Sequence, residues 1–255
     1  MQSAWIWLLI STLFFLGGLV YVATALRTGR YRPSMLNMAI MACGFLAQCA
    51  FLRIRGEQVG RCPITTPSEL LVFLSWSVVL LYFILGRAFR LSLLGAFCVP
   101  LVVAFQTFAL ILLTPAKRDP ANDYWLEMHV PVSILSYGAF ALAAVAGVMF
   151  FIQNRMLKRA QLRPLSLNLP DIRHLNQAIV RLIIIGLVLL TIGIASGFAT
   201  TKPPTGLHLV ISLTVWAAYA GLLCVKFIRG LASSQTALAA VGAFILAVVS
   251  QVIPH

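Results

Sequence analysis

Three of the four histidines in this sequence stand where a long apolar segment meets a short loop, and they are the first candidates for chemistry. His129 opens the fifth such segment, His208 opens the seventh, and His255 follows the last one. An ionisable side chain at the mouth of a membrane span is costly and is therefore a functional candidate. A neutral imidazole there suits axial coordination of haem iron, although it could also simply form hydrogen bonds among lipid headgroups. The fourth histidine, His174, falls in a basic loop and is expected to be solvated.

Glu69 and Trp125 are two further candidates, each with two interpretations. Glu69 follows Ser68, and both suit the first turn of a helix, where the helix dipole stabilises an anion. Alternatively, Glu69 pairs with an arginine of the outer face or with a ligand. Trp125 is typical of an aromatic anchor at a membrane interface, and its alternative role is stacking on a cofactor. The five cysteines have no metal-binding spacing, and the sequence contains no nucleophile elbow, phosphate-binding glycine loop or HExxH motif.

The segments that carry these residues are long and apolar. Hydrophobic residues make up 61% of the 255 positions and charged residues 10%, whereas a soluble domain is about a quarter charged. The apolar residues form blocks of about twenty, which is the length of a helix that crosses ~30 Å of hydrocarbon. We therefore predict an all-α integral membrane protein in which residues 1–255 form a single polytopic domain of about eight transmembrane helices. The predicted spans are 4–26, 35–53, 69–86, 92–114, 129–153, 178–199, 207–226 and 235–253.

The basic residues predict the orientation of these spans. Thirteen of the 19 Lys and Arg residues fall in one alternate set of loops, and six fall in the other. The positive-inside bias then puts the first set in the cytoplasm of a bacterial inner membrane and both termini outside. The net charge of +13 has the same explanation, so we expect no nucleic-acid partner. The basic loop 154–177 either only sets this topology or docks a partner protein or anionic membrane lipid.

Three segments, in order along the chain, resemble segments of one known family. They read PITTPSELLVFLSW at 63–76, WLEMHVPVSILSY at 125–137 and LLTIGIASG at 189–197. All three are similar to segments of the cytochrome c assembly protein family, whose members include CcsA, ResC and HemX. The resemblance covers about residues 60–230 and implies an eight-helix bundle that handles haem b at the outer membrane face. In the CcsA branch, a tryptophan-rich WWD loop and two outer histidines present haem for attachment to apocytochrome c.

The likeness also indicates a branch within this family. His129 matches the first outer histidine, and His255 corresponds in position, near the end of the last span, to the second. His208 matches the start of the seventh span in short members of the HemX-like and YpjD-like kind. The segment TTKPPTG at 200–206 has neither the tryptophans nor the aspartate of the WWD loop. The chain thus resembles the short branch without that motif, whose members serve haem biosynthesis control, cytochrome assembly or regulation of a partner.

Together, these features favour a haem-associated accessory protein of cytochrome c biogenesis or haem metabolism over a transferase with its own enzymatic step. We expect His129 to bind haem, or a haem-carrying partner from cytochrome c assembly or haem biosynthesis, with His208 or His255 as second ligand. The alternative is a scaffold or regulatory subunit without haem that docks its partner through 154–177. A solute transporter is disfavoured because midspan charges and broken helices are not evident. The pattern GIASG at 193–197 predicts close packing of two helices.

Overall fold

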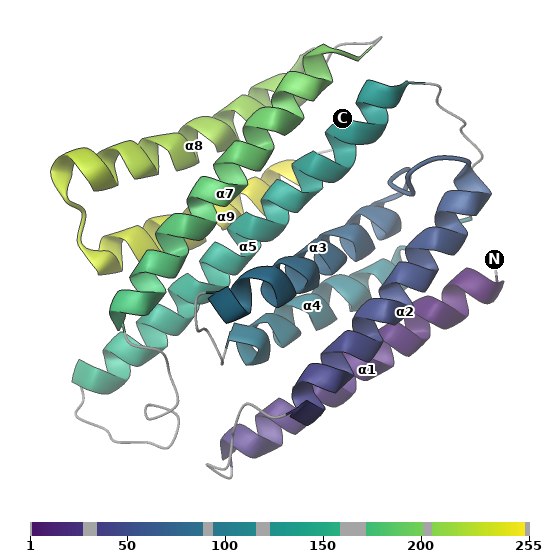
Figure 1. The fold of residues 1–255 in the computed structure, drawn as a ribbon, viewed down its shortest axis with the longest axis horizontal. Coiled ribbons are helices and arrows are strands. Elements are labelled where there is room, and N and C mark those ends of the chain that lie inside the picture. The colour runs from purple at the N-terminus through teal and green to yellow at the C-terminus, as the bar shows by residue number, and fades with distance from the viewer. Residues whose placement is uncertain are drawn as a thin grey trace. The chain divides into compact units, whose positions relative to one another are not determined.

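The computed structural model is entirely helical in the part of the chain that it describes, which is residues 2–27, 35–88, 94–115, 123–158, 172–200 and 206–252. These ranges contain eight α-helices and no strand, as the sequence predicts (Figure 1). The helices are α1 (Gln2–Arg27), α2 (Met35–Val59), α3 (Pro67–Ala88), α4 (Leu94–Ile111), α5 (Tyr124–Lys158), α7 (Ile172–Phe198), α8 (Leu207–Arg229) and α9 (Ser233–Val252). His255 and residues 159–171 of the predicted basic loop lie outside the described residues.

Seven of the described helices are long and apolar enough to cross a membrane, and α9 is apolar over the shorter stretch Ser233–Val248. The chain is therefore an integral membrane protein of the predicted class. The helices extend beyond several predicted spans. For example, α5 has 35 residues, or about 52 Å of helix, which exceeds the ~30 Å of hydrocarbon. Hydropathy indicates which residues lie in the membrane and does not mark the ends of a helix. This explains why α5 begins at Tyr124, whereas the predicted span begins at 129. The side on which the termini lie stays a prediction.

The chain divides into two compact units, which we describe separately, and the single domain predicted for 1–255 stays a proposal. Unit 1 comprises Met1–Asn122 and Met156–Pro170. Within it, α1 and α3 each pack against both α2 and α4 (Figure 1). The helices α1 and α2 come close at Gly44, where a Cβ atom would lie 2.9 Å from the ring of Phe15. Such small residues let helices approach in lipid, where the hydrophobic effect does not drive them together.

A layer of buried polar side chains crosses the middle of unit 1, with one residue from each helix. Gln48 of α2 and Gln106 of α4 both donate from Nε2 to Ser75 Oγ of α3, at 2.5 and 3.0 Å respectively. Thr12 Oγ1 of α1 lies 3.4 Å from Gln106 Oε1. All four side chains are buried. Because hydrocarbon offers no competing partner, these hydrogen bonds help to fix how the four helices pair.

Unit 2 comprises Asp123–Arg155 and Asp171–His255, with the described helices α5, α7, α8 and α9. Its core is aromatic, because Phe140 of α5 stacks on Tyr219 of α8 with ring centroids 3.8 Å apart and 7° between the planes. On another side, the ring of Phe140 faces Gly186 of α7 so closely that no Cβ atom would fit there. The packing of α5 against α7 therefore depends on glycines of α7.

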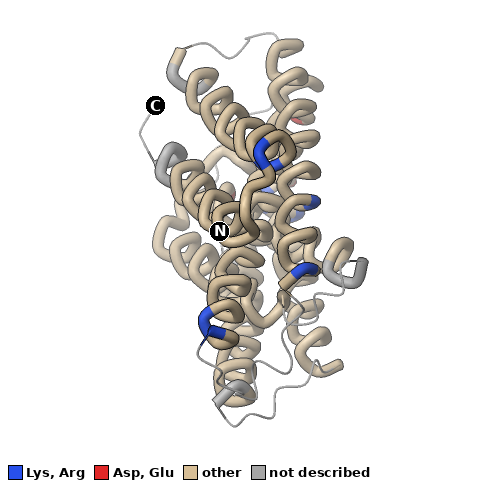
Figure 2. Tube along the Cα trace, turned by 90° about the vertical axis from the view of Figure 1, so that its left-hand side faces the viewer, with Lys and Arg blue, Asp and Glu red and all other residues tan. Residues whose placement is uncertain are grey.

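Charged residues interrupt these helices at few places. In the view of Figure 2, Lys and Arg are visible at several points and Asp and Glu at almost none. This agrees with the composition, which has 19 basic and 6 acidic residues in 255. Long uncharged stretches are what a helix in hydrocarbon requires, since each buried charge is costly there.

Candidate functional site

The first turns of α5 carry two of the predicted site residues, Trp125 and His129, one turn apart in unit 2. Asp123 caps this helix, because its Oδ1 accepts hydrogen bonds from the main-chain N atoms of Trp125 and Leu126 at 3.0 and 3.3 Å. Trp125 is 49% exposed and makes an edge contact with Tyr124. That position agrees with an interfacial anchor, and the stacking of Trp125 on a cofactor stays a prediction.

His129 is anchored by a short hydrogen bond to the main chain of α7. Its ring atom Nδ1 lies 2.6 Å from the carbonyl oxygen of Gly193. A carbonyl oxygen can only accept, so Nδ1 carries the proton and donates. In the neutral ring the basic lone pair therefore lies on Nε2, which is an atom that histidine offers to metal ions. The half-buried ring is thus held in one tautomer and one orientation.

Two glycines of α7 form the surface on which this part of α5 rests. A Cβ atom on Gly197 would lie 2.8 Å from Nδ1 and 2.9 Å from Cε1 of His129. One turn earlier, a Cβ atom on Gly193 would lie 2.5 Å from Oγ of Ser133. The pattern GIASG therefore marks close helix packing, as predicted, and the partner helix is α5. The same two glycines give the His129 ring access to a main-chain carbonyl that a larger residue would cover.

The chemistry of His129 fits a histidine that would hold haem iron. A ligating histidine usually donates its other ring N–H to a carbonyl or a carboxylate, which fixes the tautomer and raises the basicity of the ligand atom. The bond from Nδ1 to Gly193 O has this form. A single histidine would be enough for the protein to hold haem, because the porphyrin itself ligates the iron. Within the described residues there is no group of three or more His, Cys, Asp or Glu side chains that could hold a metal ion by itself.

A second histidine ligand stays a prediction. His208 lies in the first turn of α8, in the same unit as His129, but its side chain is outside the described part of the structure. His255 is likewise outside the described residues. His174 is exposed in the first turn of α7, as expected for a solvated residue.

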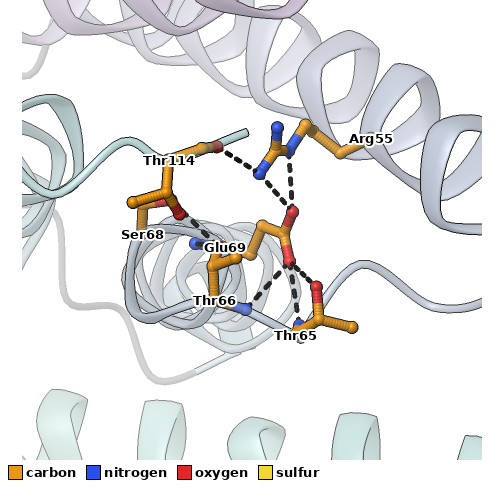
Figure 3. Close-up of polar contacts among 6 residues, drawn as sticks. All are labelled: Arg55, Thr65, Thr66, Ser68, Glu69 and Thr114. Atoms are coloured by element: carbon orange, nitrogen blue, oxygen red, sulfur yellow. Dashed lines mark hydrogen bonds and ion pairs between the residues drawn. The ribbon is translucent and has the colours of Figure 1, made fainter. Parts of the chain in front are cut away.

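Glu69 lies in unit 1, where donors of the chain itself hold its fully buried carboxylate (Figure 3). Oε1 accepts a hydrogen bond from Arg55 Nε at 2.7 Å. Oε2 accepts from N and Oγ1 of Thr65, at 2.8 and 2.9 Å, and from N of Thr66 at 3.1 Å. The pairing of Glu69 with an arginine, one of its two predicted roles, is confirmed. The cofactor-binding role predicted for Glu69 stays a prediction, and both carboxylate oxygens already have partners.

Arg55 ties together three helix ends of unit 1. It projects from the last turns of α2 and reaches Glu69 in the first turn of α3, at an N–O distance of 2.7 Å. Its Nη2 also donates to the carbonyl oxygen of Thr114, just beyond α4, at 2.9 Å. Arg55 is 1% exposed, so both charges of the pair are withdrawn from water. Removing one partner of such a pair leaves the other charge buried and uncompensated, which is costly. The pair therefore stabilises the contact between these helix ends.

Thr66 is the residue that caps α3. Its Oγ1 accepts the hydrogen bond of Glu69 N at 3.3 Å, while Glu69 Oε2 accepts that of Thr66 N at 3.1 Å. This reciprocal arrangement is a capping box, and Pro67 occupies the first helical position that suits proline. Ser68 and Glu69 lie in the first turn of α3, as predicted. Glu69 therefore serves the helix start and the ion pair at the same time.

Known proteins resemble this chain over most of its length. The family described as cytochrome C assembly protein matches residues 65–251. Protein HemX of Brevibacillus brevis is 27% identical over 210 residues, which cover 80% of this chain and 76% of the relative. Cytochrome c biogenesis protein CcsA of Synechococcus sp. is 27% identical over 252 residues, with coverage of 85% and 82%. An uncharacterized 28.8 kDa protein of Azospirillum brasilense is 30% identical over 166 residues, with coverage of 63% and 59%.

Proposed function

Since this chain belongs to the cytochrome c assembly protein family, we propose that it is an accessory membrane protein of cytochrome c biogenesis or haem metabolism that binds haem b through His129. The names of two relatives, HemX and the cytochrome c biogenesis protein CcsA, support a role in the same process. We propose the bacterial inner membrane as its location, with His129 at the outer face, because the basic residues gather in the alternate loops.

The observation that carries this proposal is the 2.6 Å hydrogen bond from His129 Nδ1 to the carbonyl oxygen of Gly193. It fixes the ring and keeps the proton on Nδ1, so that in the neutral ring the basic lone pair is on Nε2. Gly197 leaves the space that the ring needs in this position. Bound haem would supply an iron centre that can change its oxidation state. His208 or His255 would provide the second ligand, and Trp125 would stack against the macrocycle.

An accessory role is proposed rather than covalent attachment of haem by this chain alone. The segment TTKPPTG at 200–206 has no Trp and no Asp, so it lacks the side chains with which a WWD loop would hold haem near an apocytochrome. Haem bound at His129 would then be stored, sensed or passed to a partner protein of cytochrome c assembly or haem biosynthesis. This partner is expected on the same side of the membrane as His129.

The test is the absorption spectrum of the protein purified from cells that are supplied with haem. The wild-type chain should copurify with a Soret band, and His129→Ala should lose most of it. His174→Ala is the matched control, because His174 is exposed at the start of α7 and should leave the band unchanged. A wild-type protein without a Soret band, or a band that survives in His129→Ala, would overturn the proposal.

A second function, docking of a partner without haem, has one observation in its favour. Arg155 and Arg173 lie near the two ends of the predicted basic loop 154–177, and both are exposed. Among the described residues, neither arginine has an ion pair. Reversing these charges to glutamate should remove a bound partner from a pull-down if the loop docks one. An unchanged set of partners would reject this second function and would leave haem binding untouched.

A further inference from the structure

Ser196 uses the same acceptor atom that holds His129. The Oγ atom of Ser196 donates to the carbonyl oxygen of Gly193 at 2.8 Å, while His129 Nδ1 donates to that oxygen at 2.6 Å. Ser196 is 7% exposed, so water does not compete for its hydroxyl group. One carbonyl oxygen of α7 therefore receives a ring N–H from α5 and a hydroxyl from its own helix.

This sharing distinguishes Ser196 from an ordinary serine in a helix. Hydroxyl groups in helices commonly bond a carbonyl three or four residues earlier. Thr214 of α8 does so, donating to the carbonyl oxygen of Val210 at 2.7 Å. At Ser196, however, the acceptor also fixes the side chain of another helix. The hydroxyl of Ser196 therefore touches an atom that sets the state of His129.

Donors that share one oxygen weaken each other, because each draws on the same lone-pair electron density. Without the hydroxyl of Ser196, Gly193 O would be a better acceptor for the N–H of His129. A stronger bond at Nδ1 gives the ring more imidazolate character, and this makes Nε2 a stronger electron donor. The hydroxyl of Ser196 thus moderates the donor strength of Nε2 without touching it.

We propose that Ser196 is a positioning residue that tunes His129 as an iron ligand through the shared carbonyl of Gly193. This inference rests on the proposed function. A stronger donor stabilises ferric over ferrous iron, so the hydroxyl of Ser196 keeps the midpoint potential of bound haem higher than it would be with alanine there. Hydrogen bonding to an axial ligand is one of the levers by which a protein sets the potential of haem.

The first arm of the test uses the protein without haem. The chain has four histidines, so selective 15N labelling of histidine gives few NMR signals, and His129→Ala identifies the one that matters. In Ser196→Ala, the Nδ1–H proton of His129 should move downfield, because its hydrogen bond shortens. Ser196→Thr, which retains the hydroxyl, should return the signal to the wild-type position. Ser196→Cys, with its weaker donor, should give an intermediate shift.

The second arm measures the midpoint potential of the haem-loaded protein by spectroelectrochemical titration. Ser196→Ala should lower the potential, Ser196→Thr should restore it, and Thr214→Val should leave it unchanged as the matched control. An unchanged or raised potential in Ser196→Ala, or an equal change in Thr214→Val, would overturn the inference. A wild-type protein that binds no haem would instead overturn the proposed function, while the NMR arm would still accept or reject the competition for Gly193 O.

Discussion

Gly197→Ala should weaken haem binding by moving the His129 ring from its place. The new Cβ atom would lie 2.8 Å from Nδ1, whereas an ordinary contact begins at 3.4 Å. The ring must therefore retreat by about 0.6 Å. Gly193 lies one turn earlier on α7, so this retreat also lengthens the 2.6 Å bond from Nδ1 to Gly193 O to about 3.2 Å, the long end of the usual N–H to O range.

The expected magnitude follows from the weakening of that bond. Removing the hydrogen-bonding partner of a ligating histidine typically costs about 10–100-fold in metal affinity, which corresponds to about 1.4–2.8 kcal/mol. Because Gly197→Ala weakens the bond without removing it, haem titrated into the purified protein in nanodiscs should show a Kd raised by about 10-fold, the lower end of that range. The Soret difference spectrum at each haem concentration gives the two binding curves to be compared.

Two glycines serve as controls for this substitution. Gly221 of α8 has no atom within 4 Å of a would-be Cβ, so Gly221→Ala should leave haem affinity unchanged. At Gly186 a Cβ atom would strike the ring of Phe140, so Gly186→Ala should lower stability by about 1–3 kcal/mol while the protein still binds haem. Wild-type haem affinity in Gly197→Ala would refute the idea that the two glycines and the carbonyl hold His129 for its ligand.

Three further tests concern the packing of each unit. Arg55→Met or Glu69→Leu alone leaves a buried charge and should lower the free energy of unfolding by about 3–5 kcal/mol; in a denaturant-based double-mutant cycle, the double variant should lose less than the two single losses combined. Tyr219→Phe removes a buried hydroxyl that has no hydrogen-bond partner among the described residues and keeps the stacked ring, so the melting temperature should stay or rise, and a marked fall would contradict this. Ser75→Ala removes the acceptor of two buried amides and should cost about 1–3 kcal/mol per amide in chemical unfolding. Ser77→Ala, whose hydroxyl bonds a carbonyl of its own helix, should cost less, and equal losses would speak against the polar layer.

The helices could be predicted from the sequence because hydropathy alone is enough to locate them. Every predicted span corresponds to a described helix, and the differences concentrate at the ends. Hydropathy reports where a chain is in hydrocarbon, whereas α5 continues beyond it in both directions because its hydrogen bonds are satisfied within the helix. The start of α3 could be predicted more closely, since TPSE at 66–69 carries the capping-box pattern that the structure shows.

The partners of the site residues could not be predicted from the sequence. His129 bonds a main-chain carbonyl 64 residues away, and a carbonyl leaves no trace in the amino-acid sequence. The sequence indicated the position of His129 only indirectly. The glycines of GIASG predicted close packing with another helix, but they did not show which helix that is. Arg55 and Glu69 pair because α2 and α3 fold back on each other, and several other arginines of the same set of loops were equally eligible.

The claim that the imidazole of His129 is a ligand of haem iron is tested most directly by rescue with free imidazole. His129→Gly, purified from haem-supplied cells, should lack the Soret band of the wild-type protein. Imidazole added to the apo variant together with haem should restore a band at the wild-type position, because the free ring replaces the missing side chain. A wild-type Soret band in His129→Gly without imidazole would show that haem is held elsewhere and would contradict the assignment.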